Sequence, residues 1–216
     1  MARSSSSKRW LREHEADLYV GRARKEGYRS RSAYKLLEIN ARDRLFRPGM
    51  TVVDLGAAPG SWSQVARRLV GPGGRVIATD LLDMDSVPGV AFIAGDFTDP
   101  AVVDAVSQAV GGGGADLVLS DLAPNMSGMR TVDQARSLNL AECALACAQK
   151  VLKSGGGFLV KLFQGEGYDA YVRELRRQFA KVEIRKPRAS RGRSRETYVL
   201  GKVYKAGQQR PSGNGV

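Results

Sequence analysis

The stretch DLGAAPGSW at residues 54–62 decides the fold. It continues a short apolar, β-branched run, residues 51–55, of the kind that forms a strand buried on both faces of a parallel sheet. Its small residues let the backbone turn tightly and approach a ligand closely. An amphipathic run through Leu69 then predicts a helix, which Ser61 or a neighbour caps. An ordinary strand-to-helix turn would explain the glycines equally well.

Four predicted strands end at or beside an acidic residue. The pairs are residues 51–55 with Asp54, 75–79 with Asp80, 90–94 with Asp96 and 115–120 with Asp121. Ligands of open α/β sheets bind beyond the carboxyl ends of the strands, so we expect one pocket at these acids. Helix capping accounts for any one of them, but less well for the whole set.

These acids also indicate the charge of the ligand. Carboxylates repel the phosphates of a dinucleotide, whereas S-adenosylmethionine has no phosphate and carries a sulfonium and an ammonium. The pocket therefore favours S-adenosylmethionine. A nicotinamide-dependent dehydrogenase is the rival suggested by the glycine turn and Asp80, but its fuller G-x-G-x-x-G is absent and Asp96 stays unexplained.

Length and element order fit one doubly wound α/β domain with a mostly parallel, seven-stranded sheet and helices on both faces. The 216 residues, 43% of them hydrophobic, suffice for a large core. The further predicted elements are helices at 31–43, 100–110, 133–152 and 168–179, and strands at 157–163, 182–186 and 197–204. We expect residues 22–205 to form the domain, 1–21 a basic, partly disordered arm, and 206–216 a disordered tail.

The sequence predicts a cytoplasmic protein without a metal centre. No window approaches the roughly 18 consecutive apolar residues of a membrane span, and the start MARSSSSKRW lacks the apolar run of a signal peptide. His14 is the only histidine, and Cys143 and Cys147 lie four apart in a helical stretch, where core packing is expected. Nothing demands more than a monomer.

Charge is segregated along the chain. Residues 1–47 hold 13 Lys or Arg against 6 Asp or Glu, residues 173–216 hold 13 against 3, and residues 48–172 hold 8 against 13. Two basic ends thus flank an acidic centre, within a net charge of +12. This arrangement predicts a polyanion partner that is held by its phosphates.

Two basic segments are the candidates for that contact. In the first, cations alternate with tyrosines, and these tyrosines either stack on unpaired bases or belong to the core. The cations are Arg22, Arg24, Lys25, Arg29 and Arg31, and the tyrosines are Tyr19, Tyr28 and Tyr34. The second, RKPRASRGRSRE at residues 185–196, contains Pro187 and Gly192 and no apolar periodicity. We expect an exposed loop between two strands, serving RNA contact or merely solubility.

In combination, these motifs resemble the FtsJ/RrmJ family of RNA methyltransferases. The resemblance runs from about Arg22 to Lys205 and rests on DLGAAPGSW, Asp80, Asp96, SDLAPNMSG from Ser120, LVKLFQG around Lys161 and SRETYVL around Glu196. It implies S-adenosylmethionine as cofactor and methylation of the ribose 2′-hydroxyl of a uridine in 23S rRNA within the large ribosomal subunit. Related enzymes with the same set act on tRNA or mRNA caps, so the substrate is the weakest implication.

The resemblance also implies roles for individual residues. The cofactor contacts are Gly60 and Trp62 on the methionine side, Asp80 at the ribose, Asp96 at the adenine and Asp121 close to the sulfonium. The catalytic set is Lys35, Asp121, Lys161 and Glu196, with Lys161 as the proton acceptor.

The implied set is chemically reasonable. A ribose hydroxyl is a poor nucleophile until its proton is taken. An amine takes it only where burial and a nearby cation disfavour the charged form, and Lys35 offers Lys161 that cation. We expect Asp121 to orient the amine and Glu196 to hold Lys35 or the ribose. The alternatives are that Lys161 only steers the hydroxyl or is a surface lysine, and that the protein is a non-catalytic ribosome-assembly factor.

Overall fold

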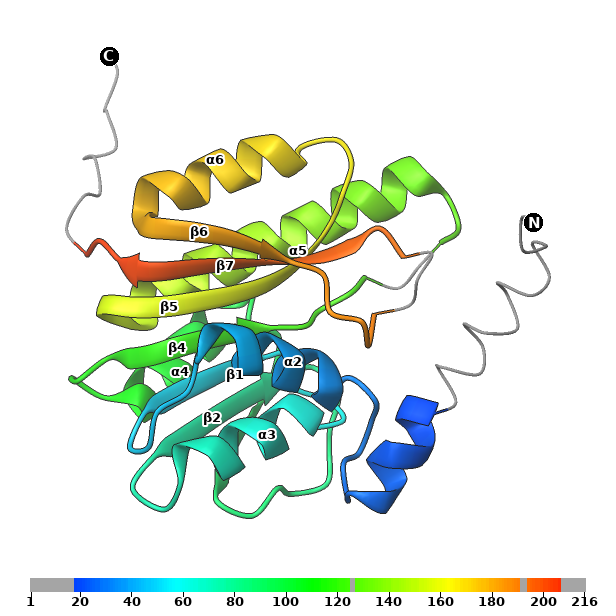
Figure 1. Ribbon diagram of the computed structural model, residues 1–216. Coiled ribbons are helices and arrows are strands. Elements are labelled where there is room, and N and C mark those ends of the chain that lie inside the picture. Colours follow the sequence, from blue (N-terminus) through cyan, green and yellow to red (C-terminus); the bar gives the residue numbers. More distant parts are fainter. Residues whose placement is uncertain (1–17, 125–126, 191–193, 207–216) are drawn as a thin grey trace.

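A sheet in the order β3-β2-β1-β4-β5-β7-β6 organises the chain, which the computed structural model describes over residues 18–124, 127–190 and 194–206 (Figure 1). The strands are β1 (Thr51–Leu55), β2 (Arg75–Asp80), β3 (Val90–Ala94), β4 (Ala115–Ser120), β5 (Leu152–Phe163), β6 (Phe179–Arg185) and β7 (Glu196–Tyr204). The first five run parallel, and β7 pairs antiparallel with both β5 and β6. The predicted mostly parallel, doubly wound sheet is confirmed.

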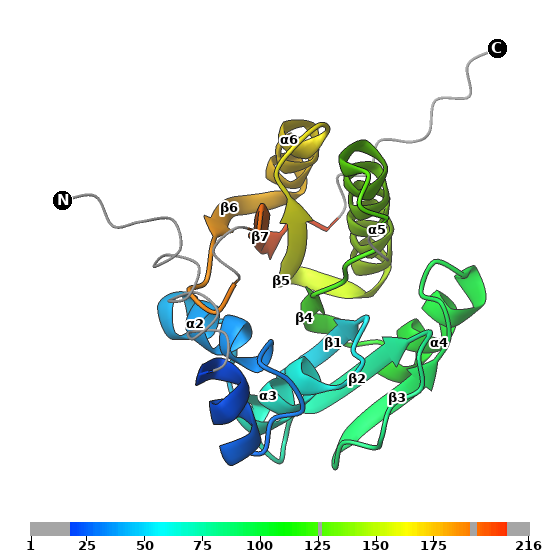
Figure 2. The same ribbon diagram turned by 90° about the vertical axis from the view of Figure 1, so that its right-hand side faces the viewer.

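Helices cover both faces of this sheet (Figure 2). On one face lie α2 (Ala33–Asp43) and α3 (Ser61–Val70), with the short helix over residues 18–25 beside them. On the other lie α4 (Pro100–Val110), α5 (Arg130–Val151) and α6 (Tyr168–Gln178). The chain runs from β1 outward to β3 and then returns to β4 on the other side of β1, which makes the carboxyl ends of β1 and β4 the place where such folds bind ligands.

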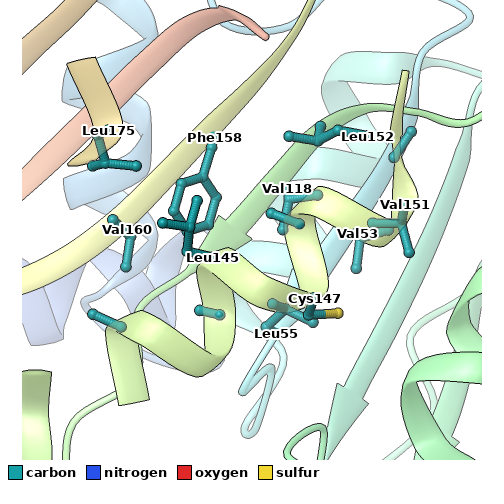
Figure 3. Close-up of a cluster of buried hydrophobic side chains, with 14 of the residues drawn as sticks. Val53, Leu55, Val118, Leu145, Cys147, Val151, Leu152, Phe158, Val160 and Leu175 are labelled. Atoms are coloured by element: carbon teal, nitrogen blue, oxygen red, sulfur yellow. The ribbon is translucent and has the colours of Figure 1, made fainter. Parts of the chain in front are cut away.

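Alternation along the strands divides the buried side chains between two cores. Val53 and Val118 point into the core under α4, α5 and α6, which Figure 3 shows with Phe158 and Cys147. Their strand neighbours, such as Val52, point into the core under α2 and α3. Because residues two apart share a face of a strand, this alternation also decides which polar side chains can meet at the sheet edge.

The predicted elements are found within a few residues of their expected bounds, with two informative differences. β5 begins at Leu152 rather than at residue 157: Leu152 already pairs with Ala115, and after a shift of register the pairing with β4 continues from Gly157, although the glycines at 155–157 give no apolar pattern. Residues 18–25 form a helix that crosses the predicted boundary between arm and domain at residue 21. Of the expected caps of α3, Ser61 or a neighbour, the neighbour Gly60 is the N-cap, with φ 102° and no side-chain hydrogen bond, and the Ser61 hydroxyl donates to Ser30 instead.

Most of the predicted basic arm and tail, residues 1–17 and 207–216, lies outside the described residues.

Candidate active site

Strand register brings the proposed catalytic residues to one place. β4 and β5 pair in parallel with Ser120 opposite Val160, so the next residues, Asp121 and Lys161, lie level with one another. β5 and β7 pair antiparallel with Lys161 opposite Tyr198. Glu196 lies two residues before Tyr198 and therefore shares its face, which is the face covered by α2.

The four residues of the expected catalytic set form one cluster of ion pairs. Lys35 comes from α2, where its Nζ atom lies 2.8 Å from Glu196 Oε1 and 3.8 Å from Asp121 Oδ1. Lys161 Nζ lies 3.2 Å from Asp121 Oδ1 and 3.8 Å from Glu196 Oε2. Each lysine therefore meets both carboxylates, and the formal charges of the cluster cancel.

The Lys161 amine points into the cluster, not toward bulk solvent. Its side chain is only 8% exposed, and Nζ also donates to the backbone oxygen of Asp121 at 3.1 Å. Asp121 thus holds the amine with its carboxylate and its main chain together, as an orienting residue would. The interpretation of Lys161 as an ordinary surface lysine does not fit this burial.

Lys35 does not simply lend positive charge to its neighbour. Its close contact with Glu196 offsets that charge. Burial of Glu196 acts to raise its pKa, but the charges of Lys35 and Lys161 and the hydrogen bonds from Lys35 and Ser190 outweigh burial and lower the pKa. Glu196 is therefore an anion that holds Lys35 in place.

Tyr198 lies at the centre of the cluster, and the sequence motifs do not single it out. Its hydroxyl donates to Asp121 Oδ1 at 2.6 Å, lies 3.2 Å from Glu196 Oε1 and accepts from Lys35 at 3.0 Å. Burial and the two carboxylates raise its pKa well above the usual 10.0. The signal that could have identified it is its spacing of two from Glu196 within a strand, which puts both side chains on one face.

The turn after β1 is built from its glycines. Gly56 has φ 72°, and a side chain there would collide with Leu122. The amides of Gly56 and Ala57 both donate to the backbone oxygen of Thr79, at 2.9 and 3.1 Å, which holds the turn on the neighbouring strand. The turn therefore presents bare backbone at the carboxyl edge of the sheet, as the sequence predicts.

Asp80 closes the same turn from the end of β2. Its two carboxylate oxygens accept from the amides of Ala58 at 2.9 Å and Leu82 at 2.8 Å. Each oxygen keeps a further lone pair for a ligand hydroxyl. Leu81 and Leu82 follow directly and are 73% and 67% exposed, so the Asp80 carboxylate lies beside apolar surface.

The remaining acids of the expected row have separate environments. Asp96 is exposed after β3, where Oδ1 accepts from the Thr98 amide at 2.9 Å. Asp54 is buried beneath the turn instead of lining a pocket, and Ser63 donates to it at 2.6 Å. Burial, with smaller contributions from the Asp121 and Asp80 charges, raises the pKa of Asp54 to about 7. Of the four acids expected at the pocket, Asp54 is therefore excluded by its burial, and Asp80, Asp96 and Asp121 remain.

Trp62 and Arg29 fix the surroundings of the turn. The Trp62 indole donates to the Ser32 oxygen at 2.9 Å, and its ring centroid lies 5.7 Å from that of Tyr198. The Arg29 guanidinium donates to the backbone oxygens of Pro59 at 2.9 Å, Asp85 at 2.6 Å and Ser86 at 2.9 Å. It thereby ties the loop after β2 down against Gly60, whose missing side chain leaves room for it.

This surrounding set fits S-adenosylmethionine better than a phosphate-bearing nucleotide. The acceptors Asp80, Asp96 and Asp121 are carboxylates, and the one guanidinium that the described residues place at the turn, that of Arg29, is engaged by three carbonyls. A cationic, phosphate-free cofactor with ribose hydroxyls matches these groups.

Several cations of the two basic segments are engaged within the protein, contrary to expectation. Arg185 is buried and donates to both carboxylate oxygens of Asp43, each at 2.7 Å, so it is no contact for phosphate. Arg29 is used as described above. Of the two interpretations given for the tyrosines, base stacking or core packing, Tyr28 and Tyr34 follow the second, because both belong to the core under α2 and α3.

The loop after β6 is only partly exposed. Pro187, Ala189 and Ser190 are buried, whereas Arg188 is exposed. Arg191, Gly192 and Arg193 lie outside the described residues. The expectation of a wholly exposed loop is therefore wrong for its first half, which packs on α2.

Metal sites and membrane-spanning helices are both absent from the described part of the chain. Within residues 18–124, 127–190 and 194–206, no group of three or more His, Cys, Asp or Glu side chains is arranged to hold a metal ion. In the same ranges, no helix has the length and apolar character that crossing a membrane requires.

Comparison with known proteins identifies the family. Residues 28–204 match the family described as FtsJ-like methyltransferase. The ribosomal RNA large subunit methyltransferase E of Pseudomonas aeruginosa is 57% identical over 205 residues, covering 95% of this chain and 99% of that protein. The protein of the same name in Pseudomonas fluorescens is also 57% identical and covers 95% of this chain and 98% of its own.

Solved structures agree with this match. A Plasmodium falciparum protein described as a ribosomal RNA methyltransferase has a TM-score of 0.75 at 28% identity, covering 82% of this chain and 98% of that one. Fibrillarin of Aeropyrum pernix, solved with S-adenosyl-L-methionine, has a TM-score of 0.55 at 17% identity over 81% of this chain and 75% of its own, and so shares the fold. With the glycine turn, the acids at the strand ends and the lysine–carboxylate cluster in place, the chain belongs to the FtsJ-like methyltransferase family.

Proposed function

We propose that this methyltransferase transfers a methyl group from S-adenosylmethionine to the ribose 2′-hydroxyl of a uridine in 23S rRNA within the large ribosomal subunit. The observation that carries the proposal is the inward-facing Lys161 amine, held by Asp121 beside the turn at residues 54–62. The names of the 57% identical relatives support ribosomal RNA as the substrate. We further propose that the protein acts in the cytoplasm as a monomer and needs no metal.

Lys161 is the proposed proton acceptor. Its Nζ atom is the only amine of the described residues that lies within 3.2 Å of Asp121, and Asp121 fixes its direction through two contacts. A hydroxyl placed against Nζ is oriented by it and loses its proton to it as the new bond to oxygen forms. Lys35 and Glu196 form the second pair, which is neutral by itself and is proposed to hold the far side of the ribose.

The cofactor would be held along the carboxyl edge of the sheet. We propose that Gly60 and Trp62 border its methionine part, Asp80 accepts from its ribose, Asp96 lies at its adenine, and Asp121 faces its sulfonium. When bound, S-adenosylmethionine supplies the electrophilic methyl group. The Asp121 carboxylate would offset the positive charge that the sulfonium brings to this edge of the sheet.

RNA phosphates are the proposed partners of the exposed cations. Arg22, Arg24 and Lys25 are exposed on the helix over residues 18–25, and Arg188 is exposed beside the catalytic cluster. A strand held by both groups is proposed to present its ribose to Lys161.

The decisive experiment measures transfer of labelled methyl groups to three substrates: large ribosomal subunits, naked 23S rRNA and tRNA. The modified nucleoside is then mapped, with Lys161→Ala as the inactive control. We expect one 2′-O-methyluridine in 23S rRNA, made on assembled subunits. Preferential methylation of tRNA would assign the other substrate class, and the absence of transfer to any of the three RNAs would support a non-catalytic assembly factor.

A further inference from the structure

A carboxylate outside the catalytic cluster, that of Glu38, accepts hydrogen bonds from three donors in two separate parts of the chain. Glu38 lies on α2, one turn after Lys35. Its Oε2 accepts from the Arg188 amide at 2.6 Å, and its Oε1 accepts from the Ala189 amide at 3.1 Å and from the Tyr19 hydroxyl at 3.1 Å. Two consecutive backbone amides of the loop after β6 are thus bound to the helix that carries a proposed catalytic lysine.

The same part of the loop is fixed by further contacts. Arg31 donates to the Ala189 oxygen at 2.7 Å, and the Ser190 amide donates to the Pro187 oxygen at 3.0 Å, which closes a turn. Ala189 is fully buried. A segment rich in Pro, Ser and Arg would otherwise be expected to move freely, so these contacts determine where Ser190 lies.

Ser190 then connects the loop to the catalytic cluster. Its hydroxyl donates to Glu196 Oε1 at 2.8 Å. The same oxygen lies 2.8 Å from Lys35 Nζ and 3.2 Å from the Tyr198 hydroxyl. Among the residues that the structure describes, Ser190 is the one donor to this oxygen that comes from the loop, since the other two come from α2 and β7.

We propose that Glu38 and Ser190 are positioning residues for methyl transfer: Glu38 fixes the loop backbone, and the Ser190 hydroxyl so placed holds the Glu196 carboxylate on Lys35. The inference rests on the proposed function. The contacts close a ring from Lys35 through Glu196, Ser190 and Ala189 to Glu38 and back along α2. Exposed Arg188 lies in this ring, so an RNA phosphate that binds Arg188 meets a backbone already joined to the catalytic cluster.

A purely structural role for these residues predicts a different outcome from a positioning role. Removal of a structural contact lowers thermal stability and leaves the rate of the folded enzyme unchanged. Removal of a positioning contact lowers the rate constant of transfer at saturating cofactor and RNA, while the KM for RNA and the affinity for cofactor stay the same. It also releases Glu196 from one hydrogen bond that favours its anion, so its pKa rises.

The experiment compares Ser190→Ala, Ser190→Thr and Glu38→Gln with the wild type and with Glu174→Gln, a change on α6 that serves as the control for Glu38. Measurements are the single-turnover rate on large subunits, the KM for subunits, the dissociation constant of S-adenosylmethionine, and the titration of Glu196 by NMR of carbon-13-labelled glutamate. We expect Ser190→Ala to lower the rate about tenfold, as removal of one hydrogen bond does, with both binding constants changed less than about twofold. Ser190→Thr keeps the hydroxyl and restores the rate.

Glu38→Gln keeps one acceptor but not two, so the rate falls by a smaller factor, about threefold, and Glu174→Gln has no effect. This variant also tests the inference if Ser190→Ala does not fold. Three results would overturn the inference: an unchanged rate in Ser190→Ala and Glu38→Gln, a defect confined to KM, or a Ser190→Thr variant that does not restore the rate. In each case the activity of the wild type would leave the proposed function standing. A wild type that methylates no RNA would overturn both.

Discussion

The Tyr198 hydroxyl donates to Asp121 Oδ1 across 2.6 Å and so joins β7 to the end of β4 in the middle of the proposed catalytic set. It has one proton to give and also lies 3.2 Å from Glu196 Oε1, so the two acceptors share a single donor. The phenol stays protonated at neutral pH, because burial and both carboxylates raise its pKa well above 10.0. Its part in the cluster is to hold other groups, not to exchange a proton with substrate.

Tyr198→Phe should therefore separate orientation from packing. The ring that packs near Trp62 is retained and only the hydroxyl is removed, so the fold should persist. We expect the turnover rate to fall about 10- to 100-fold, since Asp121, Glu196 and Lys35 each lose a partner, with cofactor affinity nearly unchanged. Turnover and equilibrium binding of S-adenosylmethionine measure the two effects. If this variant turns over at the wild-type rate, the Tyr198 hydroxyl has no part in orienting the catalytic set.

Lys161→Ala should abolish methyl transfer and leave cofactor affinity nearly intact. The amine is proposed to take the hydroxyl proton, and the predicted cofactor contacts lie on other residues. Isotope incorporation into large subunits and calorimetric titration with cofactor are the measurements. Lys150→Ala, which removes an exposed lysine of α5, is the matched control. A decrease in cofactor binding as large as the decrease in turnover would make Lys161 a cofactor or structural residue.

Arg29→Ala should weaken cofactor binding without removing a proposed cofactor contact. The guanidinium holds one backbone oxygen of the turn and two of the loop after β2, and its removal frees the loop at residues 81–89 that continues from Asp80. We expect the dissociation constant of S-adenosylmethionine to rise about tenfold, the equivalent of one to two hydrogen bonds. Arg24→Ala, an exposed arginine of the preceding helix, should leave it unchanged. Equal cofactor affinities for the wild type, Arg29→Ala and Arg24→Ala would contradict this role of Arg29.

Replacing Arg188, Arg191 and Arg193 together with alanine should weaken RNA binding and flatten its salt dependence. Removing one cation that binds a phosphate reduces the slope of log affinity against log salt by about one. RNA affinity at several salt concentrations gives the slope. Binding of S-adenosylmethionine, which these residues are not proposed to touch, is the control. If the slope stays at its wild-type value, the loop is no part of the RNA interface.

Asp43→Asn should lower stability at neutral pH. Burial alone would raise the pKa of Asp43, but the hydrogen bonds and charges of Arg185 and Lys202 outweigh burial and lower the pKa to about 2. The folded-state pKa is below the reference value of 3.8, so the stabilisation is complete above about pH 5 and is lost as pH falls toward 2. The depression corresponds to about 2 kcal/mol in the free energy of unfolding. Urea unfolding at pH 7 and pH 3 should show the difference between variant and wild type shrinking on acidification.

The strands and the turn were predictable because they are local. Apolar runs of five or six residues ending in glycine or an acid define β1 to β4 without reference to the rest of the chain. The proposed catalytic residues could be named from motifs. The roles of their side chains could not be predicted, because Lys35 meets Glu196 only where α2 lies against β7, and no spacing in the sequence predicts that contact.

The roles of the cations in the two basic segments, unlike the strands, could not be predicted from the sequence. Net charge predicts a polyanion partner, but it does not distinguish an exposed arginine from one that is paired. Arg185 and Asp43 are 142 positions apart and meet because α2 packs across β6 and β7. Tyr28 and Tyr34 likewise look like stacking residues beside arginines until the core under α2 and α3 is seen. Ion pairs between distant parts of the chain therefore decide which cations remain available to bind RNA.

The antiparallel pairing of β7 with β5 restricts how this protein can vary. Lys161 faces Tyr198 in that ladder, and Glu196 shares the Tyr198 side of the strand. Deleting one residue between Tyr198 and Tyr204 would shift the ladder by one position and turn the phenol and the carboxylate to the opposite surface together. Length changes among relatives should accordingly gather in the connection between β6 and β7, beyond the Ser190 anchor, while the strand itself keeps its residue count through evolution.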